Sequence, residues 1–134
     1  MWTQVASRDA WSVNPHRSHI VVADDEPQVL KLFARLLQHA GYSVTTVDSG
    51  SAAIRILERD SVDLLILDLS MPNPDGFDLL KLLRASRPGL RILVISGYME
   101  GALLRASEFL GATASLSKTE APARLVGVVN SLLH

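Results

Sequence analysis

Short blocks of consecutive aliphatic residues alternate along the chain with longer segments in which apolar residues recur every three or four positions. The block Leu64–Leu67 is the most uniform, and such a run of large aliphatics is typical of a strand buried on both faces in a parallel sheet. One carboxylate, Asp68, follows it, and residues 70–76 are turn formers. We therefore expect Asp68 at the end of a central strand, at the edge of the core and facing out of it.

The same pattern predicts five strands that alternate with five helices. The strands are expected at 20–23, 42–47, 62–68, 91–95 and 113–117, and the helices at 27–40, 51–59, 77–86, 102–110 and 122–133. Gly41 and Gly111 follow two of these helices, where glycine commonly ends them. Strict alternation predicts an α/β fold with a five-stranded parallel sheet flanked by five helices. We expect the flavodoxin-like strand order 2-1-3-4-5, with the less apolar second strand near an edge.

The length of 134 residues fits one domain, with no room for a second. Residues 1–18 lack a clear period and are expected to be an N-terminal extension, either a disordered leader or a partner-binding arm, before a domain at 19–134. The chain contains neither an apolar leader segment nor an apolar run long enough to cross a membrane. We therefore expect neither secretion nor a membrane span.

Charge and cysteine content exclude several classes of function. The 13 Lys and Arg residues against 14 Asp and Glu give a formal net charge of −1, without the basic run that would follow a nucleic-acid backbone. Direct binding of nucleic acid is therefore not expected. The absence of cysteine excludes disulfides, thiolate zinc sites and a cysteine nucleophile, and fits a cytoplasmic protein.

Polar residues follow four of the predicted strands, and these ends meet at one edge of a parallel sheet. They are Asp24 with Asp25, Asp68, Ser96 and Lys118. Two carboxylates about 5 Å apart repel by about 3 kcal/mol at an effective dielectric constant near 20. Three together require that one be protonated or that a divalent cation be bound. Oxygen ligands without His or Cys select Mg²⁺ or Mn²⁺.

This chemistry gives each side chain a role in phosphoryl transfer. Asp68 is the candidate nucleophile, and Asp25, helped by Asp24, is the candidate metal ligand. The Lys118 ammonium would offset the charge of the phosphoryl oxygens, and the Ser96 hydroxyl would donate a hydrogen bond to one of them. Taken singly, each residue is more often a helix cap, a loop residue or a surface lysine. Their combination at one sheet edge favours the functional interpretation.

These residues resemble the receiver domain of two-component response regulators over residues 19–133. The segments that carry the resemblance are Val21–Pro27, Leu67–Gly76, Ile95–Tyr98, and Gly111–Ala112 followed by Lys118. The resemblance implies phosphoryl transfer to Asp68 from a histidine kinase or a histidine phosphotransfer protein, and a downstream effector protein as partner. It also implies Mg²⁺ held by Asp25, Asp68 and the backbone carbonyl of Ser70. Such a domain is a signalling phosphoacceptor rather than an enzyme.

Two residues depart from the family pattern. Thr119 stands where the family usually has a proline after the lysine, so a trans peptide bond is expected there. Ser115 stands where the family commonly has an aromatic residue that turns inward on activation. The coupling of that aromatic residue to the Ser96 hydroxyl, usual in the family, is therefore lost. Tyr98 is a candidate to replace the aromatic residue or to shield the phosphoryl group.

Apolar residues left over on two helices suggest contact surfaces. On the first helix, Val29, Leu32, Phe33, Leu36 and Ala40 fit the core, and Leu30 with Leu37 are expected to contact the kinase or to pack on a neighbouring segment. On the last helix, Leu125, Val128, Val129 and Leu132 fit the core. This leaves Val126 and Leu133, with Ala114 and Leu116 nearby, for a homodimer or effector surface.

Other functions on this fold remain as alternatives. A degenerate receiver would act as a scaffold without phosphorylation, and Ser115 with Thr119 keep that possibility open. A metal-dependent phosphatase using Asp68 is disfavoured because the loops are short and no insertion encloses a substrate. A flavin carrier fits the sequence less well still, because the acidic residues 24–26 would repel the phosphate of the cofactor.

Overall fold

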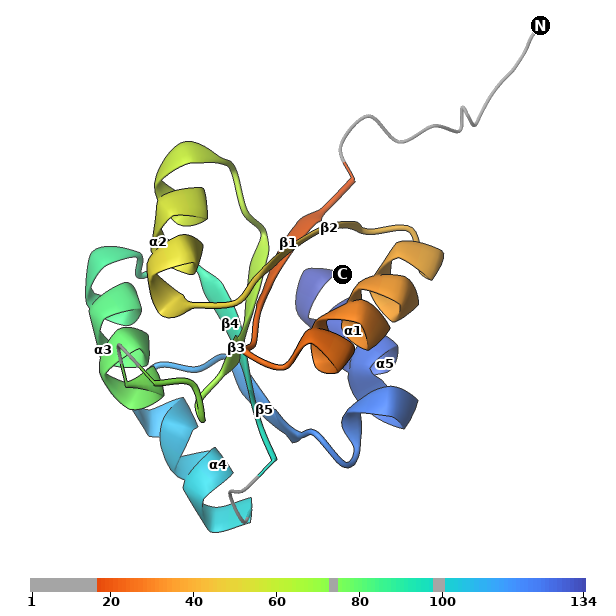
Figure 1. The fold of residues 1–134 in the computed structure, drawn as a ribbon. Coiled ribbons are helices and arrows are strands. Elements are labelled where there is room, and N and C mark those ends of the chain that lie inside the picture. Colours follow the sequence, from red (N-terminus) through yellow and green to blue (C-terminus); the bar gives the residue numbers. More distant parts are fainter. Residues whose placement is uncertain (1–16, 73–74, 98–100) are drawn as a thin grey trace, which may run out of the picture.

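Strands and helices alternate along the chain as the pattern predicts (Figure 1). The structure is a computed structural model that describes residues 17–72, 75–97 and 101–134. Most of the predicted N-terminal extension, both tryptophans and Tyr98 therefore lie outside the described residues. The elements are β1 (His19–Ala23), α1 (Pro27–His39), β2 (Ser43–Val47), α2 (Gly50–Arg59), β3 (Leu64–Asp68), α3 (Gly76–Ser86), β4 (Arg91–Ser96), α4 (Gly101–Phe109), β5 (Ala114–Ser117) and α5 (Ala121–Leu133).

In the described part of the chain, five parallel strands form one sheet in the order β2-β1-β3-β4-β5. This confirms the predicted flavodoxin-like α/β fold, with β2 at an edge. β3 lies between β1 and β4, and every residue of β3 is buried. All the strands point the same way, so their carboxyl ends share one edge of the sheet.

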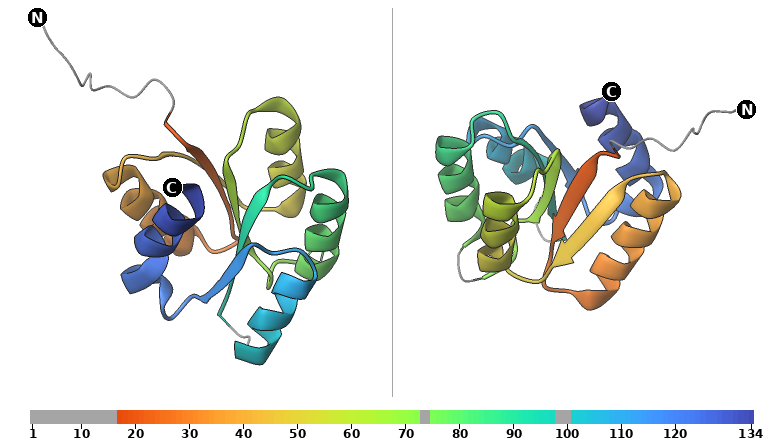
Figure 2. Two further views of the ribbon diagram at one scale, coloured as in Figure 1. Left: turned by 180° about the vertical axis from the view of Figure 1, so that it is seen from behind. Right: turned by 90° about the horizontal axis from the view of Figure 1, so that it is seen from above.

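Helices cover both faces of the sheet (Figures 1 and 2). α1 and α5 lie on one face, and α2, α3 and α4 lie on the other. Alternate residues of β3 feed the two cores: Leu64 and Ile66 pack in the cluster with α1 and α5, whereas Leu65 and Leu67 pack in the cluster with α2 and α3. Burying an aliphatic side chain of this size contributes about 1.5–3 kcal/mol, so β3 anchors both layers.

The buried face of α1 differs from the predicted one. Phe33 and Leu37 form its centre, with Leu37 fully buried, and Leu30 packs against the same core. Leu32, which was expected in the core, is 38% exposed. The prediction that Leu37 contacts a kinase is therefore wrong. The buried face draws on both apolar lines of this helix, with Phe33 from one line and Leu30 and Leu37 from the other.

The contact surface predicted on α5 and β5 also differs from the structure. Leu125 and Val129 are fully buried, as expected, with Val128 and Leu132 packed beside them. However, Leu116 is only 2% exposed, and Leu133 and Ala114 pack against the same core. Leu116 therefore cannot contribute to a contact surface, whereas Ala114, Val126 and Leu133 are each partly exposed, and the homodimer or effector surface stays a prediction.

Both ends of the described domain lie at the amino edge of the sheet. β1 begins at His19, and the Tyr42 hydroxyl, just before β2, donates a hydrogen bond to the Asn130 side chain near the end of α5.

At the close of α1, Gly41 has φ +101°, a conformation that only glycine adopts easily. Among the described residues, no helix combines the length and apolar character needed to cross a membrane.

Candidate functional site

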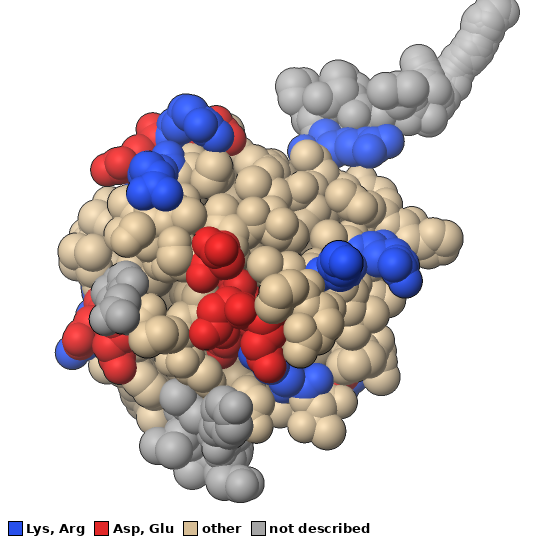
Figure 3. Space-filling model, in the orientation of Figure 1, with Lys and Arg blue, Asp and Glu red and all other residues tan. Residues whose placement is uncertain are grey.

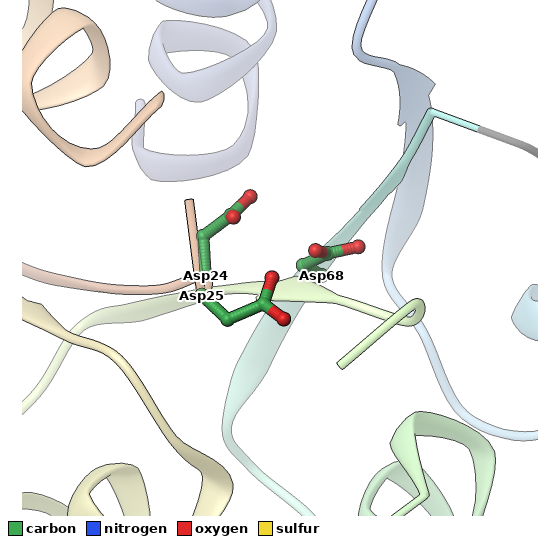
Figure 4. Close-up of side chains that lie close together, drawn as sticks. All are labelled: Asp24, Asp25 and Asp68. Carbon is green, nitrogen blue, oxygen red and sulfur yellow. The ribbon is translucent and has the colours of Figure 1, made fainter. Parts of the chain in front are cut away.

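Acidic side chains gather at the carboxyl edge of the sheet. Asp24 and Asp25 follow β1, and Asp68 ends the neighbouring strand β3, so the three side chains lie next to one another (Figure 4). One oxygen from each carboxylate lies within 4.8 Å of the others. Asp24 and Asp68 are buried, whereas Asp25 is exposed. In the space-filling view, acidic side chains form a patch in the middle of this face (Figure 3).

Local turns hold the two buried carboxylates in place. Asp24 Oδ1 accepts a hydrogen bond from the Glu26 backbone N–H at 2.8 Å, and Asp68 Oδ1 accepts one from the Ser70 backbone N–H at 2.9 Å. Such turns, in which an aspartate binds the backbone two residues on, are common where strands end. The loop after β3 returns so closely that a Cβ on Gly76 would lie 2.4 Å from the Leu69 carbonyl oxygen.

Lys118 lies over the acidic cluster, because its backbone N–H donates to the Ser96 carbonyl at the end of β4. Its Nζ is 2.6 Å from Glu26 Oε1, 2.8 Å from Asp24 Oδ2 and 3.1 Å from Asp68 Oδ2. The Asp68 side chain is therefore only 1% exposed. The expectation that it faces outward is wrong, because Lys118 and the loop after β3 contact its two oxygens.

The charges in this site shift two pKa values. Burial raises the pKa of Asp24 above its ordinary value of 3.8, although the hydrogen bonds from Lys118 and the Glu26 backbone oppose the shift. Burial alone would lower the pKa of Lys118, but its three carboxylate partners outweigh burial and raise that pKa well above 10.5. Lys118 is thus a charged ammonium at neutral pH, and the site holds more negative than positive charge.

The geometry fits a divalent cation. Asp24 Oδ2 is buried and accepts no well-aligned hydrogen bond from the described residues, although the ammonium is near. One ammonium cannot balance the three carboxylates of this cluster, so a divalent cation would relieve the repulsion that remains among them. The cluster is made only of oxygen ligands, as Mg²⁺ prefers.

Two hydroxyls complete the site. Ser96, at the end of β4, is buried, and its Oγ is 3.1 Å from Ser70 Oγ. The hydroxyl of Ser96 therefore lies on the Asp68 side of the sheet edge, next to β3 in the β3–β4 pairing. The predicted roles of these residues, including the Ser70 carbonyl as a metal ligand, remain predictions.

Sequence reasoning missed two contacts, one within the site and one between β5 and α4. Glu26 was noticed only as part of an acidic run, yet it makes the shortest contact with Lys118. The Ser115 hydroxyl, at the position of the missing aromatic residue, donates to Glu108 Oε2 of α4 at 2.9 Å. Neither partner is adjacent in sequence, so no local pattern signals these pairs. Thr119 is exposed, and its peptide geometry stays a prediction.

The profile of the response regulator receiver domain family matches residues 20–130. Among curated relatives, the transcriptional regulatory protein GlrR of Escherichia coli is 37% identical over 81 residues, which cover 60% of this chain and 18% of that protein. The response regulator SaeR of Staphylococcus aureus is 28% identical over 116 residues, which cover 87% of this chain and 50% of that protein. The chain thus spans half or less of the length of these relatives.

Solved structures give the same fold. The response regulator TrrA from Thermotoga maritima, in complex with Mg²⁺-BeF, has a TM-score of 0.77 and 28% identity, covering 87% of this chain and 99% of that chain. A CheY-like response regulator receiver domain protein from Methanospirillum hungatei has a TM-score of 0.80 and 24% identity, covering 87% and 94% of the two chains.

Proposed function

The chain belongs to the response regulator receiver domain family, and from this premise we propose that Asp68 accepts a phosphoryl group in a two-component phosphorelay. The donor would be a sensor histidine kinase or a histidine phosphotransfer protein. One observation carries the proposal: the buried Asp68 carboxylate lies within 4.8 Å of two further carboxylates and 3.1 Å from the Lys118 ammonium. The family is a signalling family, and the only reactions we assign to this chain are its own phosphorylation and dephosphorylation.

The chemistry proposed for Asp68 is a displacement at phosphorus. A carboxylate oxygen of Asp68 forms a bond to the phosphorus atom, and the bond from phosphorus to the histidine nitrogen breaks, its electron pair returning to the imidazole ring. Little covalent help is needed in such a reaction, so positioning and charge stabilisation supply most of the rate. Lys118 would stabilise the phosphoryl oxygens by its charge, and the Ser96 hydroxyl would donate a hydrogen bond to one of them.

The metal that the family implies is Mg²⁺, and the acidic cluster fits it. Asp24, Asp25 and Asp68, with the Ser70 carbonyl, would hold the ion. When bound, it neutralises negative charge between the carboxylates and the incoming phosphoryl group. Without it, the chain's own residues still orient the acceptor: the Ser70 backbone N–H fixes one Asp68 oxygen, and Lys118 contacts the other.

The outcome proposed for phosphorylation is a switch in protein–protein interaction with a downstream effector, in the cytoplasm. A change at Asp68 has a route to both helical layers, because β3 contributes residues to each core. The assembled acidic cluster and lysine favour this role over a degenerate scaffold that is never phosphorylated. A separate phosphatase activity gains no support from the geometry.

The test is incubation of the purified chain with Mg²⁺ and acetyl phosphate, followed by intact-mass spectrometry and peptide mapping. One added phosphoryl group on Asp68 is the expected result, absent in EDTA and absent in Asp68→Asn. Here the bond from phosphorus to the bridging oxygen breaks, and acetate leaves with the electron pair. A wild-type chain that remains unmodified, or that is modified equally well after Asp68→Asn, would overturn the proposal.

A further inference from the structure

Glu26 has an unusual position at the start of α1. It is the N-cap residue of that helix, with extended backbone angles of φ −99° and ψ 111°, but its side chain makes no capping hydrogen bond. Instead its carboxylate reaches the Lys118 ammonium, 92 residues away in sequence, at 2.6 Å. The Glu26 side chain is 45% exposed, whereas that of Lys118 is 16% exposed. Glu26 therefore lies nearer to solvent than Lys118 does.

Lys118 Nζ contacts three carboxylates: it donates hydrogen bonds to Glu26 and Asp68, and it forms an ion pair with Asp24. Two of these, Asp24 and Asp68, belong to the acidic cluster that fits a cation. A cation bound there competes directly with the ammonium for their oxygens. Glu26 is outside that cluster, so it is the partner of Lys118 that a bound cation leaves in place.

We propose that Glu26 acts through Lys118 as a competitor: its carboxylate binds the ammonium before phosphorylation and competes with the phosphoryl oxygens for it afterwards. This inference rests on the proposed function and adds a regulatory element to it. The phosphoryl group must draw the ammonium away from a carboxylate that is already in contact with it. Glu26 thus limits how tightly the site holds a phosphoryl group.

Two substitutions separate contact from charge. Glu26→Gln keeps the length of the side chain and removes its charge, whereas Glu26→Asp keeps the charge and shortens the reach. If the contact with Lys118 matters, both variants should release the ammonium and behave alike. If only the field of a nearby negative charge matters, Glu26→Asp should behave like the wild type. Asp48→Asn is the matched control, because Asp48 follows β2 at the same edge and makes no hydrogen bond or ion pair with the described residues.

The measurement is the affinity of the chain for beryllofluoride, formed from beryllium chloride and sodium fluoride, at saturating Mg²⁺, followed by NMR. We expect Glu26→Gln and Glu26→Asp to bind it about two- to fivefold more tightly than the wild type, the range typical of a partly exposed ion pair. The rate of phosphorylation by subsaturating acetyl phosphate should rise by the same factor. Asp48→Asn should match the wild type, and urea unfolding should show that all variants fold.

The outcomes distinguish this inference from the function on which it rests. If the wild type binds beryllofluoride and is phosphorylated on Asp68, but both Glu26 variants bind it equally well or more weakly, Glu26 does not compete for the ammonium and the inference fails. If only Glu26→Gln binds more tightly, the effect is one of charge and the contact is irrelevant. If the wild type neither binds beryllofluoride nor is phosphorylated, the proposed function fails, and the role of Glu26 fails with it.

Discussion

Replacing Asp24 by asparagine should stabilise the metal-free protein. At an effective dielectric constant near 20, charges 4.8 Å apart interact by about 3.5 kcal/mol, so Asp24 is repelled by about that much by each of its two neighbouring carboxylates. At 2.8 Å its attraction to Lys118 is about 6 kcal/mol on the same scale. Repulsion and attraction nearly cancel, and the desolvation of a fully buried carboxylate decides the sign.

Asparagine removes this desolvation cost while keeping an oxygen that can accept the Glu26 backbone hydrogen bond. Lys118 is not left unpaired, because Glu26 and Asp68 still contact it. We therefore expect Asp24→Asn to raise the free energy of unfolding in EDTA by about 1–2 kcal/mol, a large effect for one residue. The raised pKa of Asp24, caused chiefly by burial, points the same way, since it means that folding disfavours the charged form of this carboxyl group.

The assay is urea unfolding followed by far-ultraviolet circular dichroism, because both tryptophans lie outside the described domain, at positions 2 and 11. Saturating Mg²⁺ should stabilise the wild type through its binding free energy and should stabilise Asp24→Asn less. The advantage of Asp24→Asn in free energy of unfolding should therefore shrink or reverse. Asp25→Asn is the comparison, and its effect in EDTA should be smaller because Asp25 is exposed. A variant Asp24→Asn that is less stable than the wild type in EDTA would refute this reasoning.

Three further predictions concern stability. Gly76→Ala should cost at least about 2 kcal/mol because the new Cβ meets backbone atoms of the preceding loop, whereas Gly89→Ala, with no atom within 4 Å, should stay within about 0.5 kcal/mol in the same urea assay. Leu37→Glu should abolish cooperative unfolding because it buries a charge, while Leu32→Glu, at a site 38% exposed, should keep a normal transition by circular dichroism. In EDTA, the free energy of unfolding of the wild type should rise relative to that of Asp24→Asn as pH falls from neutrality toward 3.8. The reason is that the folded protein takes up the Asp24 proton more readily than the unfolded chain does. An equal pH dependence of the two proteins would contradict that assignment.

The fold was predictable because its signals are local. Aliphatic runs, helical periodicity and glycines such as Gly41 each mark an element or its end, and every predicted strand and helix is present, with boundaries that differ by at most two residues. The orientation of α1 was not predictable in the same way. Leu32 and Leu37 are equally apolar, and only contact with the sheet decides which one is buried.

The positions of the site residues were predictable for a topological reason. Parallel strands bring their carboxyl ends to one edge, so residues such as Asp24, Asp68 and Lys118 were expected to meet, and the structure brings them together. The contact between Glu26 and Lys118 could not be foreseen. It depends on side-chain reach across α1 and β5, which no spacing in the sequence encodes.

The placement of the two ends of the described domain, before His19 and after α5, bears on how it can be joined to other domains. A five-residue strand is about 17 Å long, so a polypeptide attached before His19 or after α5 starts at roughly that distance from Asp68. Such an attachment begins at the rim opposite the acceptor, away from the acidic cluster. A reporter fused before His19 or after α5 is therefore expected to leave Asp68 accessible to a donor.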